Sequence, residues 1–155
     1  MDSDLVKKFT IESGVSICEK PTSMSSDQVV FLTTMIMDEV LELLSTVHDA
    51  DTSKEILNNI IKDGKVLEQE QYTDPDEQTA SQADALVDIY YYCQNAACKR
   101  GINLSEIFRL VHKANMAKRN EETEQFIIGP GGKIMKPPGW TAPDIVAEIK
   151  RQKLE

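Results

Sequence analysis

One segment limits what this chain can fold into more than any other. Residues 27–49 contain no glycine or proline, and Ser26 or Asp27 can cap the start of a helix there. Apolar side chains fall on nearly every side of that helix: Val29, Val30, Leu32, Ile36, Val40, Leu43, Leu44 and Val47. Because a helix that is apolar all round is normally surrounded by other elements, this segment predicts the centre of a helical bundle.

Further helical patterns flank that segment, weakly at 1–12 and more clearly at about 52–70, 77–100 and 103–119. Gly101 is a natural stop for the 77–100 helix. The side chains expected to face the core are those of Ile56, Leu57, Ile60, Ile61, Ala83, Leu86, Val87, Tyr90, Ala97, Leu104, Ile107, Phe108 and Val111.

The stretch 120–143 is rich in glycine and proline, so it predicts a loop or a small hairpin, and a short helix is expected from Asp144. The sequence therefore predicts an all-α fold with four to five main helices. We expect a single domain over 1–155, with a core at about 27–119 and a C-terminal arm at about 120–155.

The charge of the chain restricts its partners. Acidic residues outnumber basic ones by 26 to 17, which gives a formal net charge of −9. Because nucleic acids and anionic membranes bind basic surfaces, this charge argues against both as partners. An anionic substrate would need a cation to bridge it to such a chain. The sequence also lacks an apolar run of the roughly 18 residues that a transmembrane helix needs.

The cysteines and the first residues predict the compartment. Cys18, Cys93 and Cys98 form an odd number without a CxxC motif, a pattern typical of reduced thiols. The first residues lack the apolar core of a secretion signal. We therefore expect a cytoplasmic protein.

The most informative feature is a set of carboxylates within apolar helices. Glu39 and Glu42 are three residues apart, so their side chains project from one face, and Asp38 precedes them. Asp84 and Asp88 are four residues apart and share one face of a later helix. Two helices with paired carboxylates can enclose a hard divalent cation such as Mg²⁺, which prefers oxygen ligands.

The position of Glu39 strengthens that interpretation. On the helical wheel it lies between Ile36 and Leu43, so we expect it to point inward. A buried carboxylate without a partner costs several kcal/mol, and residues 21–53 contain no Lys or Arg to pair with it. The alternative is that the acids form solvated helix faces, and Asp38 can equally well point outward.

A ferritin-like di-iron site is a second use of helical acids. It requires a Glu-x-x-His motif on each of two helices. Neither His48 nor His112 follows a glutamate by three residues, so this interpretation is disfavoured.

Basic side chains gather near the end of the 103–119 helix. Its inward stripe turns polar at Asn115 and Lys118, and Arg119 lies beside them. The glycines that follow could bring Lys133 or Lys136 close to a bound anion, although the spacing is not that of a P-loop. Lysine and arginine suit phosphate oxygens, but cations at a helix C-terminus also interact with the helix dipole. Acids with a cationic patch indicate metal-assisted phosphoryl chemistry.

Three motifs carry a family resemblance. They are Glu39-Val-Leu-Glu42, then ADALVD with Asp84, and finally HKANMAKRN followed by GGKIMKPPGW. In this order they resemble the all-α nucleoside triphosphate pyrophosphohydrolases, which comprise MazG-like proteins, dimeric dUTPases and phosphoribosyl-ATP pyrophosphohydrolases. The last motif resembles a phage and prophage-type branch, and the resemblance covers about 27–145. It implies a MazG-like helical bundle.

The resemblance also implies roles for individual residues. It implies that Glu39, Glu42 and Asp84 bind Mg²⁺, with Mn²⁺ as the alternative ion. One unligated carboxylate, Asp38 or Glu42, is then expected to take a proton from the attacking water. The family's first acid of the second motif falls on Ser81 here, and Asp88 is our own addition to the ligand set.

On the substrate side, the resemblance implies phosphate contacts from Asn115, Lys118 and Arg119. We add Lys133 from the arm. An aromatic side chain, Tyr91 in particular, can stack on a base, with Tyr92, Phe126 and Trp140 as alternatives; any of these can instead be core.

The implied activity is Mg²⁺-dependent cleavage of a (d)NTP or related nucleotide between the α and β phosphates, by a homodimer or homotetramer. The serine at position 81 keeps an alternative open, a non-catalytic helical module that binds nucleotide or assembles. A structural bundle with solvated acids is the third hypothesis.

Overall fold

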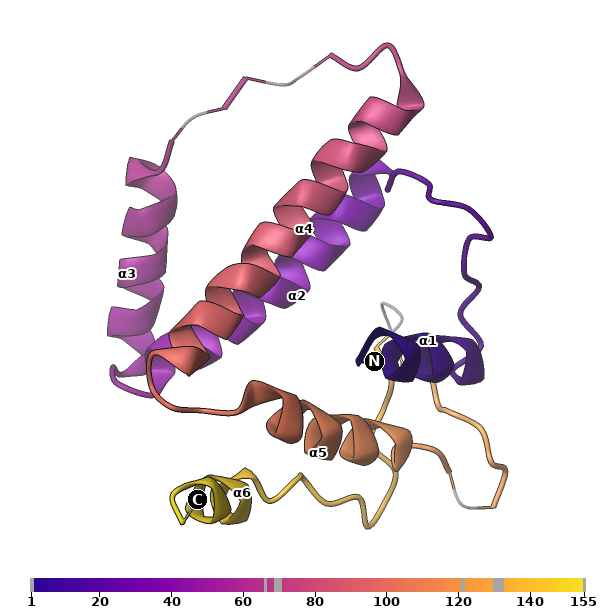
Figure 1. Ribbon diagram of the computed structural model, residues 1–155, viewed down its shortest axis with the longest axis vertical. Coiled ribbons are helices and arrows are strands. Elements are labelled where there is room, and N and C mark those ends of the chain that lie inside the picture. Colours follow the sequence, from indigo (N-terminus) through magenta and orange to yellow (C-terminus); the bar gives the residue numbers. More distant parts are fainter. Residues whose placement is uncertain (1, 66, 69–70, 121, 130–132, 155) are drawn as a thin grey trace. The chain divides into compact units, whose positions relative to one another are not determined.

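The computed structural model of the chain describes residues 2–65, 67–68, 71–120, 122–129 and 133–154. Its helices are α1 (Asp2–Glu12), α2 (Ser26–Ser45), α3 (Ala50–Asp63), α4 (Pro75–Cys98), α5 (Leu104–Met116) and α6 (Ile145–Gln152) (Figure 1). β-type pairing in the described ranges is limited to two isolated antiparallel bridges, Arg119 with Phe126 and Ile128 with Ile134. The predicted all-α class, with a hairpin and a short last helix, is confirmed.

The chain divides into two compact units. Unit 1 comprises Met1–Lys20 and Leu86–Glu155, and unit 2 comprises Pro21–Ala85, so α4 contributes to both. In unit 1, α5 packs against α1 and α6, and in unit 2, α2 packs against α3. The division does not test the prediction of a single domain.

Side-chain hydrogen bonds fix where α2 and α3 begin. Ser25 and Gln28 form a capping box, in which each side chain accepts a hydrogen bond from the other residue's backbone N–H, at 3.3 and 2.9 Å. Asp49 caps the next helix by accepting from the Thr52 N–H at 2.9 Å. The cap predicted at Ser26 or Asp27 was therefore wrong by one or two residues. The helices predicted to extend to 49 and about 70 end at Ser45 and Asp63.

The end of α4 is as predicted. Gly101 has φ +68°, the left-handed conformation that glycine adopts without strain. The Ile102 N–H donates to the Ala97 carbonyl at 3.0 Å, and the Gly101 N–H donates to the Cys98 carbonyl at 3.1 Å. These two bonds make a Schellman motif, so Gly101 stops the helix.

Two glutamines join segments that are far apart in the sequence. In unit 2, the Gln82 side chain accepts from the Met24 N–H at 2.6 Å and donates to the Met24 carbonyl at 3.1 Å. In unit 1, Gln152 of α6 accepts from the Asn103 N–H at 2.8 Å and donates to the Asn103 carbonyl at 3.2 Å. Each amide therefore satisfies both backbone groups of one residue, as a neighbouring strand would.

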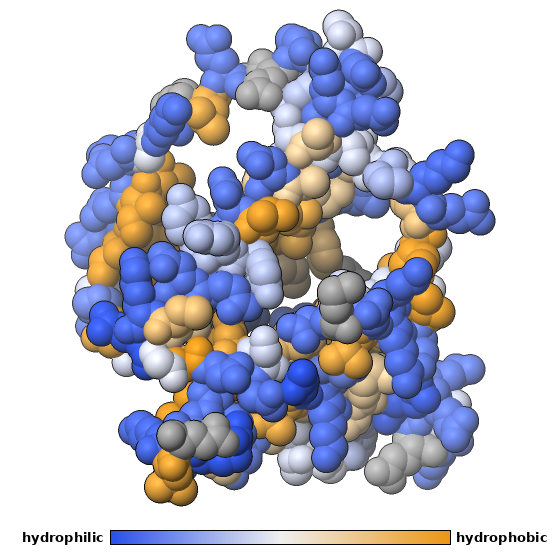
Figure 2. Space-filling view, viewed as in Figure 1, coloured by the Kyte–Doolittle hydropathy of each residue, from blue (hydrophilic) through white to orange (hydrophobic). Residues whose placement is uncertain are grey.

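Burial differs most from the sequence prediction. The buried hydrophobic residues of the described ranges are Leu57, Ala97 and Ala114, and α2 buries none of its side chains. Leu57 and Ala97 were predicted to face the core, whereas other side chains with the same prediction are open, with Leu43 70% and Ile61 62% exposed. Orange hydrophobic surface runs along the position of α3 in Figure 2. The prediction that α2 lies at the centre of a bundle is wrong for the single chain, since none of its side chains is buried there.

None of the helices in the described part combines the length and the apolar character that crossing a membrane requires.

Candidate functional site

The acids of the predicted metal site lie on the helices where the sequence placed them. Glu39 and Glu42 are on α2, and Asp84 and Asp88 are on α4. Their side chains, and that of Asp38, are exposed. The expected inward orientation of Glu39 is therefore wrong for the single chain.

The single chain does not gather these acids into one ligand set. Among the described residues, no group of three or more His, Cys, Asp or Glu side chains is arranged to hold a metal ion. This includes Glu39, Glu42 and Asp84, which all belong to unit 2. The metal assignment stays a prediction.

The hydrogen bonds of unit 2 give a physical reason. Gln82, two residues before Asp84, holds the backbone of Met24, which is just ahead of α2. Glu39 lies about 20 Å further along α2, at 1.5 Å per residue from Ser26. The start of α2, and not its acidic turn, is therefore held against this part of α4.

Unit 1 contains a cluster of lysines around one aromatic ring. The Lys136 Nζ lies 4.6 Å and the Lys118 Nζ 5.7 Å from the ring centroid of Trp140. Both separations are within the range of a cation–π interaction. Burial lowers the pKa of Lys118, and the positive charges of Lys136 and Lys133 lower it further. We call Lys118, Lys133 and Lys136 the lysine cluster.

A hydrogen bond fixes the ring that carries the cluster. The Trp140 Nε1–H donates to the Ala114 carbonyl at 2.7 Å. Each of the last four carbonyls of a helix lacks a partner within the helix. In α5 the other three accept from the backbone N–H groups of Ala117, Lys118 and Arg119. Trp140 therefore completes the C-terminal cap of α5 from the distant arm.

The arm itself is held as a small hairpin. The Gly129 N–H donates to the Lys133 carbonyl and the Met135 N–H to the Ile127 carbonyl, each at 2.8 Å. A Cβ at position 129 would lie 2.6 Å from the Met135 Sδ, so only glycine allows this close approach without a shift. The hairpin sets the backbone positions of Lys133 and of the residues that lead to Lys136.

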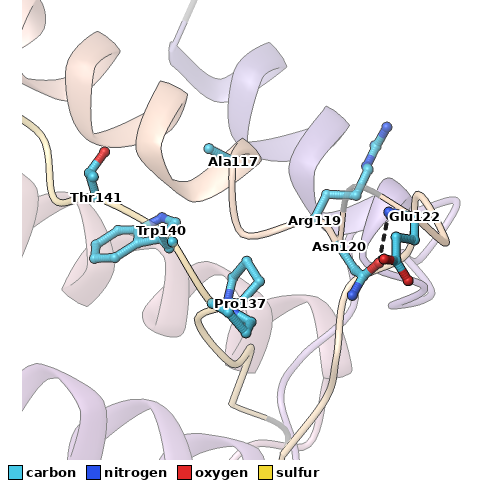
Figure 3. Close-up of a pocket in the computed structure, with 9 residues that line it drawn as sticks. Ala117, Arg119, Asn120, Glu122, Pro137, Trp140 and Thr141 are labelled. Carbon is cyan, nitrogen blue, oxygen red and sulfur yellow. Dashed lines mark hydrogen bonds between the residues drawn. The ribbon is translucent and has the colours of Figure 1, made fainter.

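A cavity of about 660 Å³ adjoins Trp140. It lies in unit 1 and is lined by Ala117, Arg119, Asn120, Glu122, Pro137, Pro138, Gly139, Trp140 and Thr141 (Figure 3). The Asn120 side chain accepts from the Glu122 N–H at 2.9 Å, the dashed line in Figure 3. One wall is therefore a polar turn, and the facing wall is tryptophan and proline.

Two comparisons with known proteins bear on this arrangement. The family model described as phosphoribosyl-ATP pyrophosphohydrolase matches residues 9–115. The chain belongs to this family. It is also similar to the crystal structure of a candidate NTP pyrophosphohydrolase from Exiguobacterium sp. 255-15. That match has 27% sequence identity and a TM-score of 0.81, and it covers 99% of this chain and 96% of that chain. No curated protein matches the chain significantly.

The family and the MazG-like all-α fold expected from the sequence are confirmed by these matches. The part of the chain that the phosphoribosyl-ATP pyrophosphohydrolase model matches contains all the acids of the predicted metal site. It ends at Asn115, before the lysine cluster and Trp140.

The predicted substrate residues have different surroundings in this family member. Arg119 forms an ion pair with Glu12, and its guanidinium carbon lies 5.5 Å from the ring centroid of Phe126. In Figure 3 its guanidinium extends away from Trp140 and Pro137. Arg119 therefore joins α1 to the segment after α5, a role that its position in the sequence did not indicate.

Lys118 lies with Lys136 over the Trp140 ring, and the positive charge of Lys133 helps to lower the pKa of Lys118. Asn115 is half-buried in the last turn of α5, and Tyr91 is 70% exposed on α4. The sequence analysis named Lys136 only as an alternative to Lys133. The Lys-x-x-Lys spacing of Lys133 and Lys136 was a signal that both could contribute.

Proposed function

We propose that the chain is a Mg²⁺-dependent nucleotide pyrophosphohydrolase. It cleaves a (d)NTP or related nucleotide to the monophosphate and pyrophosphate. The observation that carries the proposal is the family match over residues 9–115, which includes every acid of the expected metal site. The named activity of the similar Exiguobacterium protein supports the same class of substrate.

The chemistry of the acids fits a divalent cation. Glu39, Glu42, Asp84 and Asp88 supply carboxylate oxygens, which Mg²⁺ prefers and Mn²⁺ also accepts. No ion pair found in the described ranges engages any of them, so their negative charge is free for an ion. A bound ion would neutralise the polyphosphate and lower the pKa of a water molecule. Whichever of Asp38 and Glu42 does not hold the ion would accept the proton of the attacking water.

The substrate is held by cations and by one ring. Lys118 and Lys133 contact phosphate oxygens, and the Asn115 amide donates a further hydrogen bond. Arg119 contributes positive charge beside Lys118, although Glu12 takes up part of it. Tyr91, with its ring exposed, stacks on the base.

The active form is a homodimer or homotetramer in the cytoplasm. Large apolar side chains are exposed in the single chain, among them Val30 at 62% and Leu43 at 70%. Monomeric proteins rarely leave such surface uncovered, and a stable interface buries roughly 1,200–2,000 Å² in total. A second copy also supplies the acids that one chain does not gather into a ligand set.

The test is hydrolysis of a panel of (d)NTPs with Mg²⁺ or Mn²⁺, with release of pyrophosphate as the readout. Glu39→Gln and Asp84→Asn should lower turnover by at least about 100-fold, because each removes a direct ligand. Glu55→Gln, an exposed acid on α3, is the matched control and should keep full activity. Absence of pyrophosphate with every nucleotide, or full activity in both site variants, would refute the proposal.

A second candidate function is a non-catalytic module that binds nucleotide. The serine at position 81, where the family has an acid, favours it. This hypothesis predicts nucleotide binding without turnover in the natural chain. A Ser81→Glu variant, which restores the family pattern, would then gain hydrolysis, whereas an already active enzyme would not require it.

A further inference from the structure

The cavity beside Trp140 has the size and the lining of a small-molecule site. Its volume of about 660 Å³ falls within the roughly 300–1,000 Å³ of ordinary ligand pockets. Trp140, Pro137 and Pro138 form an apolar wall (Figure 3). Asn120 and Glu122 supply the few polar groups that fix the orientation of a ligand in such a pocket. The apolar wall favours a flat, uncharged ring as the occupant.

The charges at the cavity argue against a phosphate as its occupant. In the part of the chain that the structure describes, no lysine lines it. Arg119 does, but its guanidinium is paired with Glu12 and extends away from Trp140. The carboxylate of Glu122 would repel an anion. The cavity therefore suits the uncharged part of a ligand.

The amide of Asn120 is held so that it can only donate a hydrogen bond. Its Oδ1 accepts from the backbone N–H groups of Glu122 at 2.9 Å and of Thr123 at 3.0 Å. Because two donors point at this atom, it must be the amide oxygen, and the Nδ2–H groups remain as donors. Among the described residues, Nδ2 has no hydrogen-bond partner. It is therefore available to an acceptor on a ligand.

The carboxylate of Glu122 is the matching acceptor. It can accept two parallel N–H bonds, one at each oxygen. The ion pairs of the described residues do not include it. Guanine differs from the other common bases because its O6 acceptor is followed by two adjacent donors, N1–H and N2–H. Adenine, cytosine and uracil each offer a single donor group beside the acceptor.

We propose that the cavity binds the base of the nucleotide and selects guanine. Asn120 donates to O6, and Glu122 accepts from N1–H and N2–H. This deepens the proposed function and rests on it, since it names the base of the substrate. Stacking on Tyr91 does not make this choice, because every base has an aromatic face. Trp140 borders the cavity and also carries the lysine cluster, so a base in the cavity lies next to the cations assigned to the phosphates.

Mononucleotide binding to the whole protein tests the base preference without metal or turnover. GMP, IMP and AMP carry the same phosphate, but IMP and AMP each offer Glu122 one donor group where GMP offers two. Trp140 is the single tryptophan of the sequence, so its fluorescence reports occupation of the cavity that it lines. We expect GMP to bind about tenfold more tightly than IMP or AMP, the usual gain for one hydrogen bond to a charged group.

Two variants and a control assign the preference to the two side chains. Glu122→Gln removes one acceptor oxygen and the charge, so it should weaken GMP about tenfold and bring it level with IMP. Asn120→Asp keeps an oxygen for the bonds to Glu122 and Thr123 but replaces the donor nitrogen, so it should weaken GMP by at least about tenfold. Glu124→Gln, at an exposed acid outside the cavity lining, is the matched control and should bind GMP as the natural protein does.

Equal affinities for GMP, IMP and AMP would overturn the inference, and so would a preference for GMP that survives Glu122→Gln unchanged. The outcome is separable from that of the proposed function. A preference for GMP without release of pyrophosphate from any nucleotide supports the cavity and refutes the enzyme. Release of pyrophosphate with equal kcat/KM for dGTP, dITP and dATP supports the enzyme and refutes the cavity.

Discussion

Replacing Trp140 by phenylalanine tests how the arm caps α5. Phenylalanine keeps an aromatic face but lacks the Nε1–H that donates to the Ala114 carbonyl at 2.7 Å. Ala114 is 8% exposed, so water reaches the abandoned carbonyl poorly. A buried acceptor left without a donor costs about 1–3 kcal/mol. Weaker cation–π contacts with Lys118 and Lys136 add a smaller loss, about 0.5 kcal/mol.

We therefore expect Trp140→Phe to lower the free energy of unfolding by about 2 kcal/mol, which corresponds to a Tm lower by roughly 4–8 °C for a chain of this size. Thermal unfolding followed by circular dichroism, at one fixed protein concentration, measures this. Tyr92→Phe is the control, because it removes a hydroxyl from a side chain that is 71% exposed. If Trp140→Phe and Tyr92→Phe have the same Tm, the hydrogen bond from Trp140 to the Ala114 carbonyl does not stabilise the end of α5.

Three further changes test other parts of the fold by the same melting assay. Gly101→Ala should lower the free energy of unfolding by about 1–2 kcal/mol, because alanine is strained at φ +68° although its Cβ would meet no other atom. An unchanged Tm would contradict the Schellman motif as the stop of α4. Leu57→Ala, at a buried position of α3, should cost about 2–5 kcal/mol, and a loss below 1 kcal/mol would mean that Leu57 is poorly packed. Hydrogen bonds from Arg151 and Gln152 lower the pKa of Glu148 to about 2, from 4.5, so its stabilising contribution is present above pH 4.5 and is lost as the pH falls through about 2. Glu148→Gln should therefore melt below the natural protein at pH 7, and the difference should shrink toward pH 2; a constant difference would exclude this linkage.

Helix positions were predictable from the sequence because periodicity is a local property. The residues between Pro75 and Cys98 repeat with helical spacing, and a left-handed glycine follows them at a fixed distance. Helix starts were less predictable. Ser25, Ser26 and Asp27 are all good caps, and only the reciprocal bond with Gln28 selects the first of them.

Burial could not be predicted in the same way. An apolar pattern such as that of α2 shows that a helix needs covering, but it does not say whether the cover comes from the same chain. For this reason the acids were placed correctly on their helices, while the inward orientation of Glu39 was wrong in the single chain. The lysine cluster was only partly predictable. Lys118 and Lys136 lie over the ring of Trp140, and the hydrogen bond that holds this ring at Ala114 joins residues too far apart for a local pattern to predict.

The hydrogen bonds of Gln82 and Gln152 to distant backbone groups have a consequence for the lifetime of the molecule. Each depends on a single amide nitrogen, at Gln82 for Met24 and at Gln152 for Asn103. Spontaneous deamidation replaces that nitrogen with an anionic oxygen, which would then face a carbonyl oxygen and repel it. A molecule in which either glutamine has deamidated would lose that contact, at the entry to α2 or at the docking of α6, although its gene still encodes the amide.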